Sequence, residues 1–182
     1  MSGICKIKVA QEQLKSSSNL DTLLKKISED TTEMMDAMND IVWTINARND
    51  RFENIINRMR EHAVQLFEAK DCLLHFNFDK HLDHLKFDME KRKDFYLIYK
   101  EALNNIAKYA EAKNVWIELI AKGAQISLSI KDDGKGFDKN AVRKSANGLI
   151  NMQNRAANLN GQINIQSDFG KGTEICLTFP YH

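Results

Sequence analysis

Apolar residues recur at helical spacing in the first quarter of the chain. Between positions 20 and 45 they follow intervals of four, three, seven, four, three and four, at Leu20, Leu24, Ile27, Met34, Met38, Ile41 and Ile45. This heptad pattern predicts a helix that buries one face against other helices. Met35 and Val42 widen the apolar stripe, which favours a four-helix bundle over a two-stranded coil.

A shorter apolar pattern precedes this helix, at Ile4, Ile7 and Leu14, and Ser16–Asp21 has the composition of a turn. Residues 1–48 are therefore predicted to form a helical hairpin. Because a hairpin this thin cannot bury its apolar stripe alone, we expect a homodimer in which two hairpins form the bundle. The alternative is a hairpin that folds back on the rest of its own chain.

Beyond residue 48 the apolar spacing changes several times, and each change predicts a new element. Asp50 followed by Glu53 resembles a capping box at the start of a helix. In order, the sequence predicts a helix from Asp50 to about Ala69, a strand at Cys72–Phe78, a helix at Phe87–Ala110, strands at Val115–Leu119 and Ile126–Ile130, a helix at Gly148–Leu159, and strands at Ile163–Ile165 and Ile175–Phe179. Residues 49–182 are therefore predicted to form an α+β domain with helices on one face of a sheet.

Charge and composition narrow the classes of function. The 182 residues include 26 basic and 25 acidic ones, so a nucleic-acid partner, which needs a basic face, is not expected. Three cysteines without a C-x-x-C pair are typical of reduced thiols in a cytoplasmic protein. The chain has no signal peptide and no apolar run near the roughly 20 residues that span a bilayer, so a membrane anchor is expected only in segments of a longer parent chain.

Glu101 and Asn105 lie four residues apart and therefore share one face of the helix predicted at Phe87–Ala110. The amide oxygen of Asn105 suits a magnesium ion that is bound mainly by phosphates and water. Lys108 is expected on the same face, within reach of a phosphate. The alternative is an ordinary solvated face, but apolar residues of this helix define its core side independently.

A glycine turn, Asp132–Gly136, follows the strand predicted at Ile126–Ile130. Gly134 and Gly136 let the backbone approach a ligand closely, and a carboxylate at a strand end can accept a hydrogen bond from the amine of a base. The alternative is a common Asp-Gly hairpin turn. The segment that follows, Phe137–Asn147, is polar and lacks a strand pattern, which argues against a hairpin.

Two further glycine blocks follow the turn. Gly148 opens a predicted helix whose free N–H groups can bind phosphate, or it is simply a glycine at an N-cap. Gly170–Thr173 precedes the last strand, either as a plain hairpin loop or as a second place where backbone approaches a ligand. In this order and spacing, the blocks predict one nucleotide pocket.

The blocks Glu101–Asn105, Asp132–Gly136, Asn147–Met152 and Gly170–Thr173 resemble the N box, the G1 box and the two later glycine boxes in the ATP-binding domain of sensor histidine kinases of two-component systems. The wider GHKL superfamily includes gyrase-type, Hsp90-type and MutL-type ATPases. The likeness spans roughly Phe87–Pro180. It implies a Bergerat-type α/β sandwich, a mixed sheet covered on one face by helices, preceded by the hairpin that dimerises as a four-helix bundle.

The resemblance implies that residues 49–182 are an ATP-binding catalytic domain that uses Mg²⁺. It makes Asn105 the Mg²⁺ ligand. It makes Glu101 the group that handles a proton, and Lys108 the group that contacts phosphate. It makes Asp132 the acceptor for the adenine amine. The other implied contacts are Tyr109 along the nucleotide, Gly134, Gly136, Gly172 and Thr173 around adenine, Gly148 and Leu149 at the phosphates, and Arg143 and Lys144 in a mobile lid over 137–147.

The N-terminal part resembles the same family. Ile41–Asn46 is similar to the end of the second dimerisation helix in a subgroup of these kinases, and Ser2–Ile4 to the residues just after that subgroup's phosphoacceptor motif. No histidine lies in a phosphoacceptor context, whether His62, His75, His81, His84 or His182. The chain is therefore expected to be a fragment that binds Mg-ATP but cannot phosphorylate itself.

Three positions depart from the common pattern of this family. Ala146 stands where many relatives have the first glycine of a G-x-G pair, which would stiffen the hinge of the lid. Ala47 replaces a proline often found at the linker, and Tyr109 replaces a commoner histidine.

The implied function of the parent protein is histidine kinase activity. It would transfer the γ-phosphoryl group of ATP to a histidine of the dimerisation helix, and then to an aspartate in the receiver domain of a response regulator. One alternative is an anti-sigma-type serine kinase or another GHKL ATPase, against which the heptad helix argues. The other is a degenerate dimeric scaffold, against which the nearly complete set of motifs argues.

Overall fold

The computed structural model describes residues 20–28, 31–32, 34–35, 38–46, 51–80, 82, 85, 87–138 and 147–181. The chain divides into two compact units, Met1–Trp43 and Thr44–His182. The division lies a few residues before the predicted boundary between 48 and 49. Thr44 and Asn46 belong with the larger unit, where their carbonyl groups accept hydrogen bonds from Arg92.

In the smaller unit, all the described residues from position 20 onward are helical, as the heptad pattern predicts. Its apolar stripe is exposed, with Leu20 at 56%, Met34 at 71% and Met38 at 65% of full side-chain exposure. The first arm of the predicted hairpin lies outside the described residues, and the dimeric four-helix bundle stays a prediction.

The larger unit contains one mixed sheet of five strands in the order β1-β2-β3-β5-β4. β1 pairs with β2 in parallel, and the other neighbours pair antiparallel. The strands are β1 (Leu73–Phe78), β2 (Asn114–Lys122), β3 (Gln125–Asp132), β4 (Gln162–Ser167) and β5 (Thr173–Pro180). β2 to β5 include the predicted strand segments, and β1 begins one residue after the predicted start at Cys72, because the side chains alternate between a buried and an outer face.

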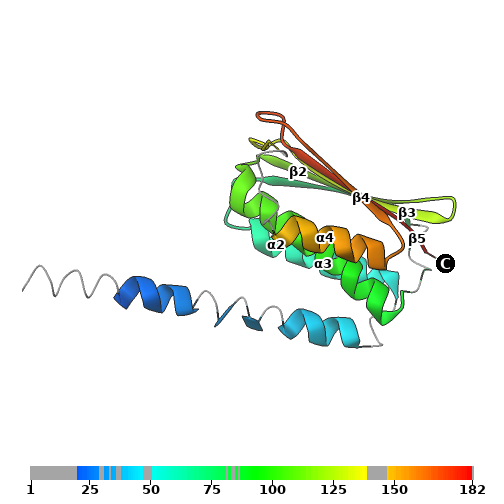
Figure 1. Ribbon diagram of the computed structural model, residues 1–182, viewed down its shortest axis with the longest axis horizontal. Coiled ribbons are helices and arrows are strands. Elements are labelled where there is room, and N and C mark those ends of the chain that lie inside the picture. The colour runs from blue at the N-terminus through cyan, green and yellow to red at the C-terminus, as the bar shows by residue number, and fades with distance from the viewer. Residues whose placement is uncertain are drawn as a thin grey trace, which may run out of the picture. The chain divides into compact units, whose positions relative to one another are not determined.

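Three α-helices cover one face of this sheet, α2 (Phe52–Phe67), α3 (Met89–Asn105) and α4 (Asn147–Asn158) (Figure 1). The arrangement confirms the predicted α+β sandwich. α3 continues into a π-helical turn, η3 (Ile106–Ala110), which the sequence pattern does not predict. Sequence spacing alone could not distinguish this turn from the end of an ordinary α-helix.

The helix ends follow local chemistry. The side chain of Asp88 caps α3 by accepting a hydrogen bond from the Lys91 N–H at 2.8 Å. α4 ends at the predicted Asn-Gly signal, where Asn160 adopts φ +53° and donates from its N–H to the Ala157 carbonyl at 2.9 Å. α2 has Arg51 as its N-cap without a side-chain bond, and Asp50 of the expected capping box lies outside the described residues.

An aromatic cluster joins the helices to the sheet. The rings of Phe52 and Phe87 lie 4.8 Å apart, and those of Phe87 and Phe179 lie 5.7 Å apart, both edge to face. Phe95 completes the cluster from α3, and all four side chains are at most 2% exposed. This packing fixes α2 and α3 against β5, and so fixes the face of α3 that carries Glu101 and Asn105.

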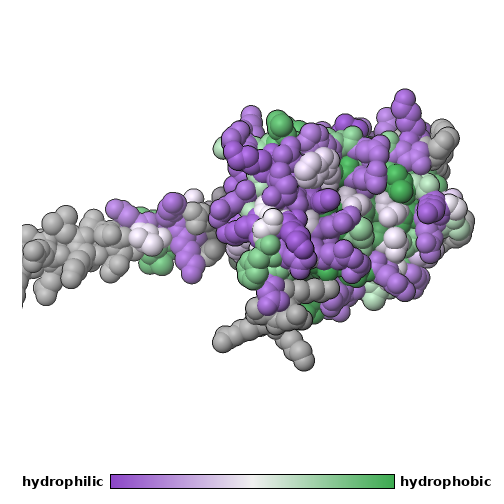
Figure 2. All heavy atoms as spheres, turned by 90° about the horizontal axis from the view of Figure 1, so that it is seen from above, coloured by the Kyte–Doolittle hydropathy of each residue, from purple (hydrophilic) through white to green (hydrophobic). Residues whose placement is uncertain are grey.

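The outside of the larger unit is mostly hydrophilic on the face shown in Figure 2, with small apolar areas between the polar ones. Among the residues that the structure describes, no helix combines the length and the apolar character that crossing a membrane requires.

Candidate nucleotide site

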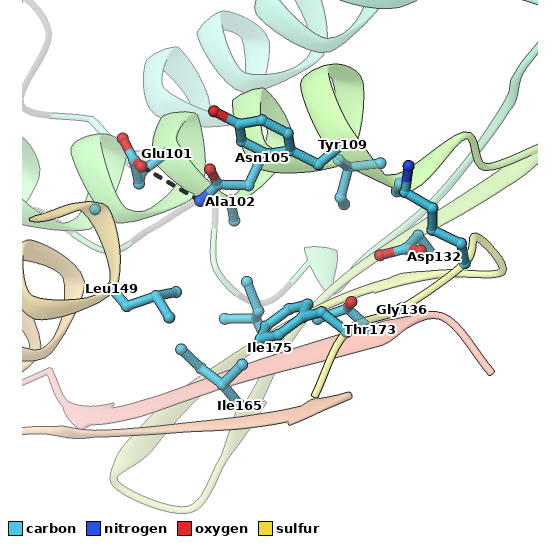
Figure 3. Close-up of a pocket in the computed structure, with 15 residues that line it drawn as sticks. Glu101, Ala102, Asn105, Tyr109, Asp132, Gly136, Leu149, Ile165, Thr173 and Ile175 are labelled. Atoms are coloured by element: carbon cyan, nitrogen blue, oxygen red, sulfur yellow. Dashed lines mark hydrogen bonds between the residues drawn. The ribbon is translucent and has the colours of Figure 1, made fainter. Parts of the chain in front are cut away.

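A cavity of about 490 Å³ lies between the helices and the sheet of the larger unit. Figure 3 shows Glu101, Asn105 and Tyr109 on one side of it, Ile165 and Ile175 on the other, and Asp132 toward one end. The lining residues come from α3, η3, the end of β3 and the turn after it, the start of α4, β4 and β5. They are Glu101, Ala102, Asn105, Ile106, Tyr109, Ala110, Asp132, Lys135, Gly136, Phe137, Gly148, Leu149, Ile165, Thr173 and Ile175.

The helical wall of the cavity is formed by residue pairs that recur every four positions: 101 and 102, 105 and 106, and 109 and 110. An α-helix has 3.6 residues per turn, so pairs spaced by four drift around its axis. The wider turn of η3 offsets that drift and keeps Tyr109 and Ala110 facing the cavity. π-helical turns of this kind are frequent at functional sites.

The same turn explains the place of Lys108. This residue was expected to share the face of Asn105, because positions three apart are neighbours on an α-helix. Each residue of the wider π-helical turn rotates less about the helix axis, so a residue three positions after Asn105 does not reach the face that Asn105 occupies. Lys108 is exposed and does not line the cavity.

Glu101 and Asn105 form a hydrogen-bonded pair at one end of the cavity. The Nδ2 of Asn105 donates to Glu101 Oε1 at 3.2 Å, and both side chains are half-buried. Because the amide nitrogen is turned to the carboxylate, the amide oxygen is the atom left for a cation. Carboxylate and amide oxygens are suitable ligands for Mg²⁺. Among the described residues no group of three or more His, Cys, Asp or Glu side chains gathers into a self-contained metal site.

Glu101 also faces the beginning of α4. A Cβ atom added at Gly148 would lie 2.1 Å from Glu101 Oε1, so any other residue at this position would displace the Glu101 carboxylate. Gly148 and Leu149 both line the cavity. Gly148 therefore has a reason in packing, besides the free N–H groups that a helix start offers to an anion.

Asp132 is the last residue of β3 and is only 1% exposed. Its Oδ1 accepts a hydrogen bond from the Gly134 N–H at 2.8 Å, whereas its Oδ2 is buried without a hydrogen-bond partner. Burial raises the pKa of this carboxyl group, against the lowering effect of the Gly134 N–H and of the nearby polar groups of Thr173. A buried acceptor without a partner is costly, so a donor supplied by a ligand would stabilise the site.

The turn after Asp132 is not a hairpin, because β3 pairs with β2 and β5 and residues 133–138 form no strand. Its glycines were expected to admit a ligand, but the structure gives them a different reason. A Cβ at Gly134 would lie 2.2 Å from the Ala110 carbonyl oxygen, and a Cβ at Gly136 would lie 2.1 Å from that of Asp168. These glycines let backbone segments pack on one another; of the two, only Gly136 lines the cavity.

Gly172 precedes β5 and Thr173 begins it, beside Asp132. A Cβ at Gly172 would lie 2.0 Å from the Asp132 carbonyl oxygen, so this glycine also serves backbone packing, and it does not line the cavity. Thr173 does line it, and its hydroxyl lies 3.0 Å from that of Ser167. Arg143 and Lys144, implied for the lid, lie outside the described residues, as does Ala146.

Several lining residues were missed from the sequence. Most are apolar and form the floor and walls of the cavity: Ala102, Ile106, Ala110, Phe137, Ile165 and Ile175. Their spacing is that of ordinary core residues, so no sequence signal separates the two roles. Lys135 was also missed; its Nζ lies 2.7 Å from Glu111 Oε1, and its backbone N–H donates to the Ala110 carbonyl at 2.8 Å.

The arrangement has a distinct chemical character. An apolar floor suits a planar ring, a buried carboxylate oxygen at one end suits an N–H donor on that ring, and an amide and a carboxylate at the other end suit a hydrated cation. Mg²⁺ keeps several water and phosphate ligands and needs only one or two from the protein, so Asn105 and Glu101 fit it.

Comparisons with known proteins agree with this geometry. The family described as histidine kinase-, DNA gyrase B- and HSP90-like ATPase matches residues 90–182. The chain is 39% identical over 129 residues to the sensor histidine kinase YdfH of Bacillus subtilis, a match that covers 69% of this chain and 30% of that protein. The chain therefore spans less than a third of that relative.

Solved structures show the same fold at low identity. The histidine kinase domain of the Erythrobacter litoralis EL346 blue-light activated histidine kinase matches 70% of this chain and 61% of its own, with a TM-score of 0.60 and 15% identity. The Acinetobacter baumannii histidine kinase AdeS matches 90% of this chain and 84% of its own, with a TM-score of 0.64 and 13% identity.

Proposed function

Because this chain belongs to the family of histidine kinase-, DNA gyrase B- and HSP90-like ATPases, we propose that its cavity binds ATP with Mg²⁺. One observation carries the proposal: a single cavity has the unpartnered Oδ2 of Asp132 at one end and the Glu101–Asn105 pair elsewhere in its lining. A carboxylate oxygen that lacks a donor is matched by the exocyclic amine of adenine, which has hydrogens to give.

The same geometry supports the proposed assignments at the triphosphate. Asn105 Oδ1 would hold the Mg²⁺ ion, and Glu101 would orient both the Asn105 amide and a metal-bound water. When bound, Mg²⁺ would neutralise charge on the transferring phosphoryl group. The apolar floor, with Leu149, Ile165 and Ile175, would exclude water from the base. Lys108, outside the lining, is expected to contribute less than Asn105.

We further propose that the whole protein is a sensor histidine kinase that works as a homodimer. It would pass the γ-phosphoryl group of ATP to a histidine of the dimerisation helix, and then to an aspartate of a response-regulator receiver domain. The likeness to a protein named as a sensor histidine kinase supports this. For the catalytic domain, the task would be positioning and charge neutralisation rather than covalent chemistry.

The histidines of this chain are not proposed as phosphoacceptors. His62 lies half-buried in α2, and His75 lies in β1 with its ring stacked 5.4 Å from that of Trp116. His81, His84 and His182 lie outside the described residues. Because none of the five histidines lies in a phosphoacceptor context of the sequence, we expect the chain to bind Mg-ATP without labelling itself.

The test is a titration with a fluorescent ATP analogue in the presence and absence of Mg²⁺. Asp132→Asn is expected to weaken binding by about tenfold or more, since it replaces the matched acceptor. Asn105→Ala is expected to abolish the Mg²⁺ dependence of binding. Asp71→Asn, which alters a fully exposed carboxylate, is the matched control. It should change neither the affinity for the analogue nor its dependence on Mg²⁺.

Equal binding by all the variants would contradict the site assignment, and no binding by the unaltered chain would favour a dimeric scaffold without catalysis. Joined to a histidine-bearing phosphoacceptor helix, the chain should acquire acid-labile phosphate from labelled ATP. Phosphorylation of a serine in a partner protein instead would favour the anti-sigma-type kinase.

A further inference from the structure

A hydroxyl group behind the cavity, that of Ser167, joins the turn after β3 to the start of β5. Ser167 is the last residue of β4, is half-buried and pairs with Thr173 in the register of the sheet, but it does not line the cavity. Its Oγ accepts a hydrogen bond from the Phe137 N–H at 2.9 Å. The same oxygen lies 3.0 Å from the Gly172 carbonyl oxygen and 3.0 Å from Thr173 Oγ1. Since Phe137 and Thr173 line the cavity, Ser167 acts on the site from outside it.

The number of donors and acceptors gives the direction of these bonds. A serine hydroxyl has one hydrogen to donate and two lone pairs that accept. The Phe137 amide can only donate and the Gly172 carbonyl can only accept, so Ser167 accepts from the first and donates to the second. One lone pair remains, so the bond with Thr173 requires that the Thr173 hydroxyl is the donor. This count, rather than an observed hydrogen position, assigns the Thr173 hydrogen to Ser167.

With its hydrogen turned to Ser167, the Thr173 hydroxyl has only lone pairs to offer to the cavity. Figure 3 shows Thr173 near Asp132, at the end of the cavity away from Glu101. The polar groups of Thr173 are close enough to lower the pKa of the Asp132 carboxyl group, yet Asp132 Oδ2 has no hydrogen-bond partner. Two acceptor oxygens, those of Thr173 and Asp132, therefore serve the same end of the cavity.

We propose that Ser167 is a specificity-determining residue, which takes the hydrogen of Thr173 and so keeps this end of the cavity selective for an amino group over a carbonyl. The proposal rests on the proposed function for its ligand, because the base of ATP carries an amine where that of inosine triphosphate carries a carbonyl. Without Ser167, the Thr173 hydroxyl would turn its hydrogen to Asp132 Oδ2 or to a ligand carbonyl. Because Ser167 acts through Thr173, it is a positioning residue.

The first experiment compares ATP and inosine triphosphate by titration calorimetry in the presence of Mg²⁺. The unaltered chain should bind ATP more tightly. Ser167→Ala should weaken the binding of ATP about tenfold and that of inosine triphosphate by less than about twofold, so the preference falls. A merely structural defect would weaken the binding of both nucleotides alike. Ser127→Ala, which removes a half-buried hydroxyl of β3 outside the lining, is the matched control and should leave both affinities unchanged.

The second experiment tests whether Ser167 acts through the Thr173 hydroxyl. Thr173→Val keeps the shape of the side chain but has no hydrogen to turn. In that background, adding Ser167→Ala should no longer change the preference for ATP, because the two substitutions remove one and the same bond. An equal effect of Ser167→Ala with and without the Thr173 hydroxyl would overturn the proposal. A lack of preference for ATP in the unaltered chain would overturn it as well.

The third experiment needs no nucleotide. NMR titration of the Asp132 carboxyl carbon measures its pKa, which should be lower in Ser167→Ala than in the unaltered chain, because a carboxylate that gains a donor holds its charge more easily. An unchanged pKa would overturn the assigned direction of the Thr173 hydroxyl. If the unaltered chain binds neither nucleotide, the proposed function fails, and this titration still decides whether Ser167 directs Thr173.

Discussion

The proposed recognition of the base by Asp132 depends on an imbalance between its two carboxylate oxygens. One oxygen is satisfied by the Gly134 N–H and the other is buried without a donor. In a protein interior such an acceptor costs stability, so natural proteins rarely leave one. The position is best understood as a site whose hydrogen bond is completed by a ligand.

The raised pKa of Asp132 predicts how its substitution depends on pH. Its folded-state pKa lies above the ordinary value of 3.8, so its ionised form destabilises the fold; the cost is absent below the unfolded pKa and complete above the folded pKa. Relative to the unaltered chain, Asp132→Asn should therefore gain unfolding free energy as the pH rises from below 3.8 to neutral. Chemical denaturation across that range measures it. If the difference in unfolding free energy between Asp132→Asn and the unaltered chain did not change with pH, as expected for Asp71→Asn, the argument from burial would be contradicted.

The functional side chains were predictable to different extents. Glu101 and Asn105 could be named because they share a helix face away from the predicted core side, and Asp132 because it enters a glycine turn after a predicted strand. Ile165 and Ile175 could not, since a pocket floor and a core demand the same residue types. Lys108 was expected on the same face as Asn105 because α-helical geometry was assumed. It lies outside that face because the turn η3 is wider than an α-helical turn.

Among the elements, the turns at the ends of β3 and β5 depend on close backbone packing. Gly170 and Gly172 both have φ +75°, but a Cβ at Gly170 would meet nothing within 4 Å, whereas one at Gly172 would lie 2.0 Å from the Asp132 carbonyl oxygen. A comparison of substitutions at these two glycines therefore separates the cost of the left-handed backbone conformation from the cost of the backbone clash. Both turns lie next to Asp132 or to the cavity, so their geometry bears on the site.

Gly170→Ala should cost about 1–2 kcal/mol of unfolding free energy, the price of a left-handed conformation for an L-residue. Gly172→Ala should cost several kcal/mol, because it adds a backbone clash to the same conformational cost. Urea denaturation of the two variants measures the difference. Equal losses would show that the approach of the turn to β3 is not as close as the structure has it.

The five strands and the helices could be predicted because their apolar periods of two and of about four are sustained over whole elements. What could not be predicted is where short-range bonds decide the geometry. The π-helical turn η3 and the uncapped start of α2 at Arg51 leave no mark in the apolar pattern. The order of the strands in the sheet likewise depends on pairings between distant segments.

For the molecule as a whole, the predicted homodimer depends on the exposed apolar residues that the structure describes between positions 20 and 45. Leu24 is 55% exposed and Met38 is 65% exposed, whereas the larger unit buries most of its large apolar residues in a core. Contiguous exposed apolar surface of this kind marks an interaction site. The expected partner is the same helix of a second copy.

Met38→Glu and Ile41→Glu should each weaken the homodimer, because they place a charge in the apolar seam. Sedimentation equilibrium measures the change in mass with concentration. Val64→Glu is the matched control, since Val64 is a 54% exposed apolar residue in α2 and does not belong to the heptad stripe. An unaltered chain that is monomeric at all concentrations would favour a hairpin folded back on its own chain.

The convergence of four short sequence blocks on one cavity is the property on which the proposed function depends. A crystal structure of the chain with Mg²⁺ and a non-hydrolysable ATP analogue tests it most directly. The adenine amine should lie within hydrogen-bond distance of Asp132 Oδ2, and the metal should lie on the side-chain oxygen of Asn105. A nucleotide bound outside this cavity, or with its base turned away from Asp132, would contradict the assignment.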